Sequence, residues 1–211
     1  TPWLVWLLLS KRPGLAPDFV PRAWMTGSWP SNCWAGATME SQAEAERRCP
    51  DLLRLPAPRH FASYEPAQEA VDFTNIGGKN ALAWQMNGLT PTRLDWVIYG
   101  GESGDHARPS DVAWGRSMIR QSRAAGAAPW FKQTGCRGYD SDAPGSVVDG
   151  EARIMAAGAK LGRNAIMSTP GLIRTLSTPH GSALVDLPED CRVQERPAPL
   201  PVRAIPAEAC A

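Results

Sequence analysis

The sequence predicts an α/β fold built from strand–helix units whose strands run parallel. Five short apolar runs in the first 135 residues have the length of buried strands. Their starts are spaced by about 30 residues, the length of one βα unit. Each run is continuous rather than alternating, as in strands that are covered on both faces. The predicted strands are residues 4–9, 33–38, 59–63, 94–99 and 128–132.

The connection after the second strand predicts a helix that opens at Ser41. Glu44 follows three residues later, and this spacing is the signature of a capping box, in which the two side chains bind free peptide N–H groups. Pro50 lies further along the same segment. Because proline lacks a peptide N–H and its ring clashes with the preceding turn, we expect a kink or a break there.

The connection after the fourth strand predicts a second helix, which starts near Ser110, has Asp111 in its first turn and ends at Gly126. The long connection 66–93 predicts an irregular loop, because glycine and asparagine interrupt it. A short helix is also expected within the Gly/Ala-rich residues 151–162.

Two architectures contain repeated βα units, a barrel and a doubly wound open sheet. A dinucleotide-binding open sheet carries G-x-G-x-x-G after its first strand, and the chain has no such motif. We therefore favour a partial TIM-type (β/α) barrel over residues 1–135. Residues 136–169 form a poorly defined extension. The proline-rich residues 170–211 are expected to be disordered, because they bury too little apolar surface to offset their ordering entropy.

Charge and cysteine content narrow the classes of function. The 22 basic and 21 acidic residues leave a net charge of +1, which argues against a general binder of nucleic acid or of anionic membranes. No apolar run approaches the roughly 18 residues of a membrane span. The five cysteines are an odd number and contain no C-x-x-C pair, so we predict no metal site. These features are typical of a cytoplasmic protein.

The candidate site lies where the predicted strands end, because ligands of both architectures bind at the carboxyl ends of parallel strands. Three carboxylates and three cations follow the apolar runs, so we expect them to converge on one edge of the sheet. No catalytic residue is predicted. The candidate cofactor-binding residues are Lys11, Arg12, Glu40, Glu65, Gly100, Gly101, Glu102, Ser103, Lys132 and Gln133.

Several of these candidates also have a simpler interpretation. Glu40 can favour the positive start of the helix that follows it. Glu65 precedes a proline, as an exposed turn residue often does. Paired glycines can form a tight turn, although they also let a backbone approach a ligand closely. Lys11 and Arg12 can belong to a solvated basic turn.

Five segments together resemble a phage-associated family of unknown function that is named for phage gene products 37 and 68. The resemblance covers about 130 residues, and the order of the segments is the same. The segments are WLLLSKRP at 6–13, CWAGATMESQ at 33–42, HFASYEP at 60–66, LDWVIYGGESG at 94–104 and WFKQ at 130–133.

This resemblance implies a radical-SAM-like partial TIM barrel. In such relatives a cysteine-rich segment before the first of these strands holds a 4Fe-4S cluster that binds and reduces S-adenosylmethionine. Because this chain enters the strand directly, we expect it to be N-terminally truncated, to hold no cofactor by itself and to be inactive alone. The implied partner of full-length relatives is a nucleotide or nucleic-acid substrate, and no membrane.

The resemblance also implies roles for the charged candidates. Glu40, Glu65 and Glu102 would bind amino or ribose groups, whereas Lys11, Arg12 or Lys132 would bind a carboxylate or phosphate. The alternative is a non-catalytic module that binds a nucleotide or a protein on the partial barrel.

Overall fold

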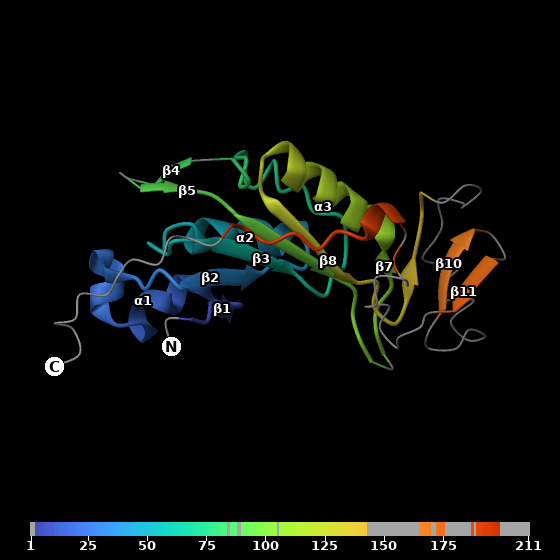
Figure 1. The fold of residues 1–211 in the computed structure, drawn as a ribbon, viewed down its shortest axis with the longest axis horizontal. Coiled ribbons are helices and arrows are strands. Elements are labelled where there is room, and N and C mark those ends of the chain that lie inside the picture. Colours follow the sequence, from blue (N-terminus) through green and yellow to red (C-terminus); the bar gives the residue numbers. More distant parts are fainter. Residues whose placement is uncertain are drawn as a thin grey trace.

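The computed structural model describes residues 3–83, 92–104, 106–142, 187 and 189–198, and the backbone of 85–87, 90–91, 165–169 and 172–175. Its centre is a sheet of five parallel strands whose spatial order equals their chain order (Figure 1). This sheet confirms the predicted α/β class and all five strands, to within two residues at each end. The strands are β1 (Trp6–Ser10), β2 (Cys33–Thr38), β3 (His60–Tyr64), β6 (Trp96–Gly100) and β8 (Ala128–Gln133).

The first predicted helix is α2 (Gln42–Leu52), and its start agrees with the sequence. The Ser41 side chain accepts a hydrogen bond from the Glu44 N–H, as the capping box requires. The predicted break at Pro50 does not occur, because the helix continues through it to Leu52. Pro50 lies in the last turn, where only a single backbone hydrogen bond is lost and little helix remains to be redirected.

The second predicted helix is α3 (Val112–Ala124). Asp111 is its N-cap rather than a residue of its first turn, and the carboxylate accepts a hydrogen bond from the Ala113 N–H. Gly126 follows the helix in the left-handed region at φ 69°, which glycine adopts without a steric cost.

Shorter elements complete the described fold. The connection that was expected to be irregular contains an antiparallel hairpin of β4 (Gln85–Asn87) and β5 (Thr90–Thr92). The predicted helix within 151–162 lies outside the described residues. A second sheet has the order β11-β10-β9-β7. The remaining elements are η1 (Pro13–Leu15), α1 (Ala16–Phe19), η2 (Trp24–Ser28), β7 (Ser110–Asp111), β9 (Gly138–Tyr139), β10 (Ala165–Thr169), β11 (Leu172–Thr175) and η4 (Glu189–Cys191).

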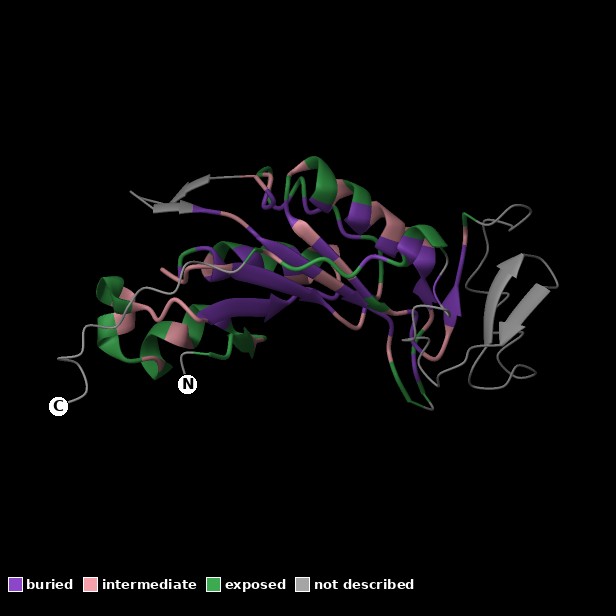
Figure 2. Ribbon diagram, viewed as in Figure 1, coloured by how far each residue is buried: buried purple, intermediate pink, exposed green. Residues whose placement is uncertain are grey.

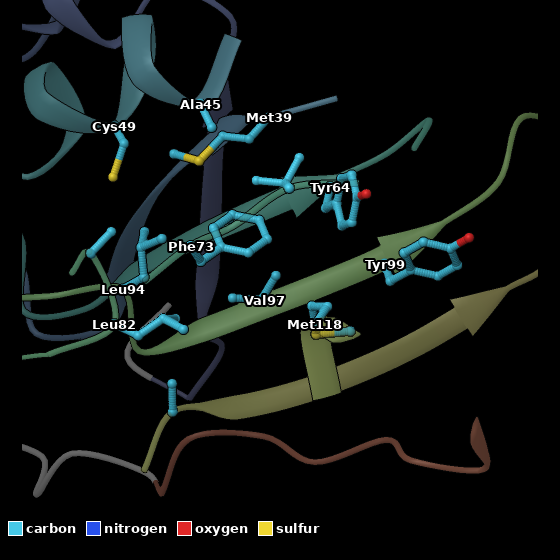
Figure 3. Close-up of a cluster of buried hydrophobic side chains, with 14 of the residues drawn as sticks. Met39, Ala45, Cys49, Tyr64, Phe73, Leu82, Leu94, Val97, Tyr99 and Met118 are labelled. Carbon is cyan, nitrogen blue, oxygen red and sulfur yellow. The ribbon is translucent and has the colours of Figure 1, made fainter. Parts of the chain in front are cut away.

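The two faces of the main sheet have different partners. Helices α2 and α3 cover one face, and the side chains between helices and sheet form the main core (Figures 1 and 3). Tyr64 and Tyr99 lie in this core with ring centroids 5.3 Å apart. The opposite face carries a separate cluster of Trp34, Phe61 and Trp96. Because side chains alternate along a strand, β2, β3 and β6 each contribute residues to both clusters.

The edge of the sheet at β8 is covered by a segment near the C-terminus. The Phe131 N–H binds the Val193 carbonyl at 2.7 Å, and the Glu195 N–H binds the Pro129 carbonyl at 2.9 Å. Cys191 and Val193 are buried in the main core. Part of the range 170–211, which was expected to be disordered, therefore packs against the sheet. Within the described residues, no helix is long and apolar enough to cross a membrane.

Candidate functional site

The three predicted carboxylates lie just beyond the carboxyl ends of β2, β3 and β6. Glu40 lies two positions after Thr38 of β2, and Glu65 lies two positions after Ser63 of β3. Thr38 and Ser63 are on the face of the sheet that carries the aromatic cluster. Since side chains alternate, both glutamates continue that face of the sheet. Each carboxylate is bound by at least one cation. The cations of Glu40 and Glu65 come from other segments of the chain, whereas Glu102 binds Arg108 of its own loop. The contacts give each of the three carboxylates a cation, but among the described contacts they do not include the side chain of Arg12, one of the three predicted cations.

Glu40 is a buried carboxylate with two cations. Its Oε1 lies 3.1 Å from Lys11 Nζ, and its Oε2 lies 2.6 Å from Arg48 Nη1. Arg48 is itself buried and also donates to the Thr38 carbonyl. Burial by itself would raise the pKa of Glu40, but its backbone hydrogen bond and those from Arg48 and Lys11 outweigh burial and lower the pKa. Glu40 therefore stays ionised, and its binding capacity is largely used by the chain itself.

Glu65 has a different environment. Its Oε2 accepts a hydrogen bond from Lys132 Nζ at 3.0 Å, while its Oε1 is buried and has no partner within the described residues. Burial raises the pKa of this carboxyl group, and the charge of Lys132 only partly opposes that. A buried acceptor without a donor costs free energy that a ligand hydroxyl or amine can recover.

The glycine at the end of β6 makes room for Glu65. A Cβ at Gly100 would lie 2.8 Å from Glu65 Oε1, which is too close for a normal contact. A Cβ at Gly101 would lie 2.1 Å from the Thr134 carbonyl oxygen, which belongs to the backbone. Both glycines are therefore needed for close approach to other parts of the chain, rather than for a left-handed turn.

Glu102 is held by Arg108 through three hydrogen bonds. The Arg108 Nε lies 2.7 Å from Oε2, Nη2 lies 3.0 Å from Oε1, and the Arg108 N–H binds Oε2 at 2.8 Å. The hydrogen bond from the Arg108 side chain lowers the pKa of Glu102, against a smaller opposing effect of burial. Glu40 also contributes to the raised pKa of Arg108, so the two carboxylates act on one guanidinium.

Gln133, at the end of β8, adds an amide to the edge, where it meets the loop after β6. Gln133 Nε2 donates to the Gly101 carbonyl at 2.8 Å and to Ser103 Oγ at 3.0 Å. Arg12 differs from the other candidates: it is exposed, and its peptide N–H binds Ser10 Oγ. Among the described contacts, none brings the Arg12 side chain to this edge.

Two cations that bind the site carboxylates were not among the residues predicted from the sequence. Arg48 lies three positions after the buried Ala45, so helical spacing places it toward the inner face of α2, and this signal could have identified it. Arg108 lies in the loop after β6, and its spacing from Glu102 follows no regular structure. No local pattern could have paired those two residues.

The described cysteines do not fit an iron–sulfur cluster. Cys33, Cys49 and Cys191 are buried, and Cys136 is half-buried. Burial raises the pKa of Cys49 to about 12, which disfavours the thiolate that ligates metals. Within the part of the chain that the structure describes, no group of three His, Cys, Asp or Glu residues could hold a metal ion.

A groove of about 410 Å³ lies at the opposite, amino edge of the sheet. Its charged groups already bind one another, since Arg59 Nη1 lies 2.7 Å from Asp95 Oδ1 and Arg123 Nη2 lies 2.6 Å from Glu195 Oε1. The second pair joins Glu195 to the last turn of α3. In βα folds this edge serves stability rather than ligand binding, so the carboxyl edge remains the candidate site.

A family model described as a protein of unknown function (DUF5131) matches residues 1–170. The chain belongs to this family. The match confirms a family of unknown function, whereas a link to phage gene products or to radical S-adenosylmethionine enzymes goes beyond its description. A search of curated proteins and a search of solved structures found no match.

Proposed function

We propose that this DUF5131 chain is a binding module whose carboxyl edge holds a small polar ligand of the nucleoside or amino-acid type. The observation that carries the proposal is Glu65. Its buried Oε1 has no donor among the described residues, while Lys132 holds the other oxygen. A ligand amine or hydroxyl would donate to Glu65, and an anionic group of the same ligand would bind Lys132.

We further propose that the sheet is part of a TIM-type barrel. All neighbouring strands of the main sheet are parallel and follow one another in chain order, without the reversal of order that defines a doubly wound sheet. Helices cover one face, and the aromatic cluster lies on the other. This division supports an inner and an outer face, as in a barrel.

S-adenosylmethionine is the first ligand to test, because the resemblance to the phage-associated radical-SAM-like family implies it. Its ribose hydroxyls and amine suit Glu65, and its carboxylate suits Lys132. When bound, this cofactor supplies alkyl or adenosyl groups for transfer. Since the described cysteines do not fit a 4Fe-4S cluster, no step of the proposal runs through one. The residues of this chain bind and orient the ligand.

Calorimetric titration of the 211-residue chain tests this function. S-adenosylmethionine, adenosine, methionine and ATP are the probes, each titrated separately. We expect saturable binding of at least one probe. The variant Glu65→Gln should bind that probe at least about tenfold more weakly, because one ionised hydrogen bond of this kind contributes about 1.5–3 kcal/mol.

The matched control is Asp18→Asn, which removes a carboxylate from α1, away from the site. It should bind as the unchanged chain does. Thermal unfolding of both variants shows that a loss of binding is not a loss of fold. Absence of binding for all four probes, or equal binding by Glu65→Gln, would contradict the proposal.

A further inference from the structure

The groove at the amino edge of the sheet holds more positive than negative charge. Within the described residues, four arginines and two carboxylates line it, namely Arg59, Arg93, Arg123, Arg196, Asp95 and Glu195. Four positive charges against two negative charges leave an excess of two. The chain as a whole has a net charge of only +1, so this excess is a local feature of the groove.

The excess begins in the buried part of the groove. Arg59 Nη1 lies 2.7 Å from Asp95 Oδ1, and Arg93 Nε lies 3.6 Å from the same oxygen. The two arginine side chains are only 17% and 15% exposed, and Asp95 is 5% exposed. Among the described residues, two buried guanidinium groups thus share one carboxylate. Burying charge that is not fully paired costs free energy, and a bound anion would recover part of that cost.

Two of the arginines retain hydrogen-bond donors for such an anion. Arg59 donates to Asp95 through Nη1, whereas its Nε has no partner among the described residues. The guanidinium of Arg196 lies over the Trp130 ring, 4.8 Å from its centroid. A stacked guanidinium uses its flat face, and its N–H groups lie in the plane of the group and stay available.

The exposed side of the groove is formed by Arg123 and Glu195. Arg123 Nη2 lies 2.6 Å from Glu195 Oε1, and both side chains are about half exposed, so the pair contributes little to stability. The Glu195 N–H binds the Pro129 carbonyl at 2.9 Å, so the backbone also joins this segment to β8. Figure 2 shows the segment 195–198 as a largely exposed coil.

The end of α3 reduces this positive charge only in part. Carbonyl groups at the C-terminus of a helix carry about half a unit of negative charge, which is less than the excess of two. Arg93 Nη1 donates to the Ala125 carbonyl at 2.9 Å, and Nη2 donates to the Gly126 carbonyl at 3.1 Å. These hydrogen bonds offset the charge of the helix end, so the groove as a whole stays positive.

We propose that this groove binds a phosphate or pyrophosphate group. A guanidinium pairs with two oxygens of a phosphate at once, and several arginines converge here. The volume of about 410 Å³ lies within the roughly 300–1,000 Å³ of small-molecule pockets.

The bound anion would stabilise the fold. It would join the segment 195–198 to Arg59, next to β3, and this role agrees with the amino edge of βα folds as the edge that serves stability. The proposal does not rest on the proposed ligand of Glu65, which binds at the carboxyl edge.

Calorimetric titration of the 211-residue chain tests the site, with inorganic phosphate, pyrophosphate and AMP as separate probes. We expect saturable binding of at least one probe, and a melting temperature that rises with its concentration. Arg196→Met should weaken this binding about tenfold or more, because a hydrogen bond between charged groups is lost. Glu195→Gln should strengthen it about twofold to fivefold, because the groove loses a negative charge.

The matched control is Arg47→Met, which removes an arginine that is paired with a glutamate on the surface of α2. It should bind the anion as the unchanged chain does. Thermal unfolding without anion shows that each variant is folded. Tighter binding of AMP than of pyrophosphate would identify the ligand as an organic phosphate, and the reverse would identify it as a free anion; either result supports the site.

Four results would overturn the proposal. The first is no saturable binding of any probe. The second is an equal rise of the melting temperature with sodium chloride at the same ionic strength, which would reduce the effect to screening. The third is weaker binding by Glu195→Gln, and the fourth is equal weakening by Arg47→Met and Arg196→Met.

Discussion

Glu40 and Glu65 occupy equivalent positions in neighbouring strands, yet their surroundings differ. Each lies two residues beyond a pair of residues, Thr38 and Ser63, that are opposite each other in β2 and β3. Within the described residues, Glu40 has two cations and a lowered pKa, whereas Glu65 has one half-exposed lysine, one oxygen without a partner and a raised pKa. The difference shows that a charged residue at the end of a strand does not by itself indicate a ligand site. Glu40 joins β2 to α2 and to the segment after β1, while Glu65 Oε1 is bound by none of the described residues.

The largest expected effect on stability comes from removing Arg48, the buried cation of Glu40. Removing Lys132, the cation of Glu65, gives the comparison. Arg48→Met leaves Glu40 buried without its inner partner and should lower the free energy of unfolding by about 3 kcal/mol. Lys132→Met removes a half-exposed partner and should cost less than about 1 kcal/mol. Urea unfolding of both variants measures the difference. Similar losses for the two variants would mean that the two pairs have the same structural role.

The paired glycines test the space around Glu65. Gly101→Ala would bring a Cβ against the Thr134 backbone carbonyl, which cannot move by a side-chain rotation, so we expect a loss of about 2 kcal/mol in stability. Gly100→Ala meets only the Glu65 side chain, which can rotate away. Its stability loss should stay near or below about 1 kcal/mol, while ligand affinity falls. Unfolding and calorimetric titration together separate the two effects, and a larger stability loss for Gly100→Ala would contradict this packing.

The smallest expected effect is the pH dependence of stability. The lowered pKa of Glu40 means that its contribution is present above about pH 4.3, the ordinary value for glutamate, and is lost as the pH falls through its folded pKa. The raised pKa of Glu65 means the opposite: its contribution is complete below that value and is lost as the pH rises through its folded pKa.

Urea unfolding between pH 3 and pH 7 measures this contrast in the variants Glu40→Gln and Glu65→Gln. The stability deficit of Glu40→Gln relative to the unchanged chain should shrink on acidification. For Glu65→Gln, the stability of the unchanged chain relative to the variant should instead increase on acidification. If both differences changed in the same direction, the contrast between the two carboxylates would be wrong.

Much of the fold could be predicted from local patterns. The five parallel strands follow from continuous apolar runs, and the start of α2 follows from Ser41 and Glu44, because strand burial and capping depend on neighbouring residues. The effect of Pro50 was not predictable in the same way. Its consequence depends on how much helix remains after it, and the structure places it in the last turn.

The candidate site was predicted as a set of residues but not as a set of pairs. Nine of the ten candidates lie at the carboxyl edge, since parallel strands must end on one side of a sheet. Arg12 is exposed beside that edge, and Arg48 and Arg108 complete it. Which cation binds which carboxylate depends on how α2 and the loop after β6 pack, and no spacing in the sequence encodes that.

The sequence by itself determined the class of fold, the strands and the edge at which charge gathers, because periodicity and chain direction dictate these features. The direction in which the pKa of each glutamate is shifted depends on the tertiary structure. Burial and partner geometry lower the pKa of one glutamate and raise that of its neighbour. The structure likewise decided that β8 is covered while β1 is exposed, since both strands are apolar in sequence and only their neighbours in space differ.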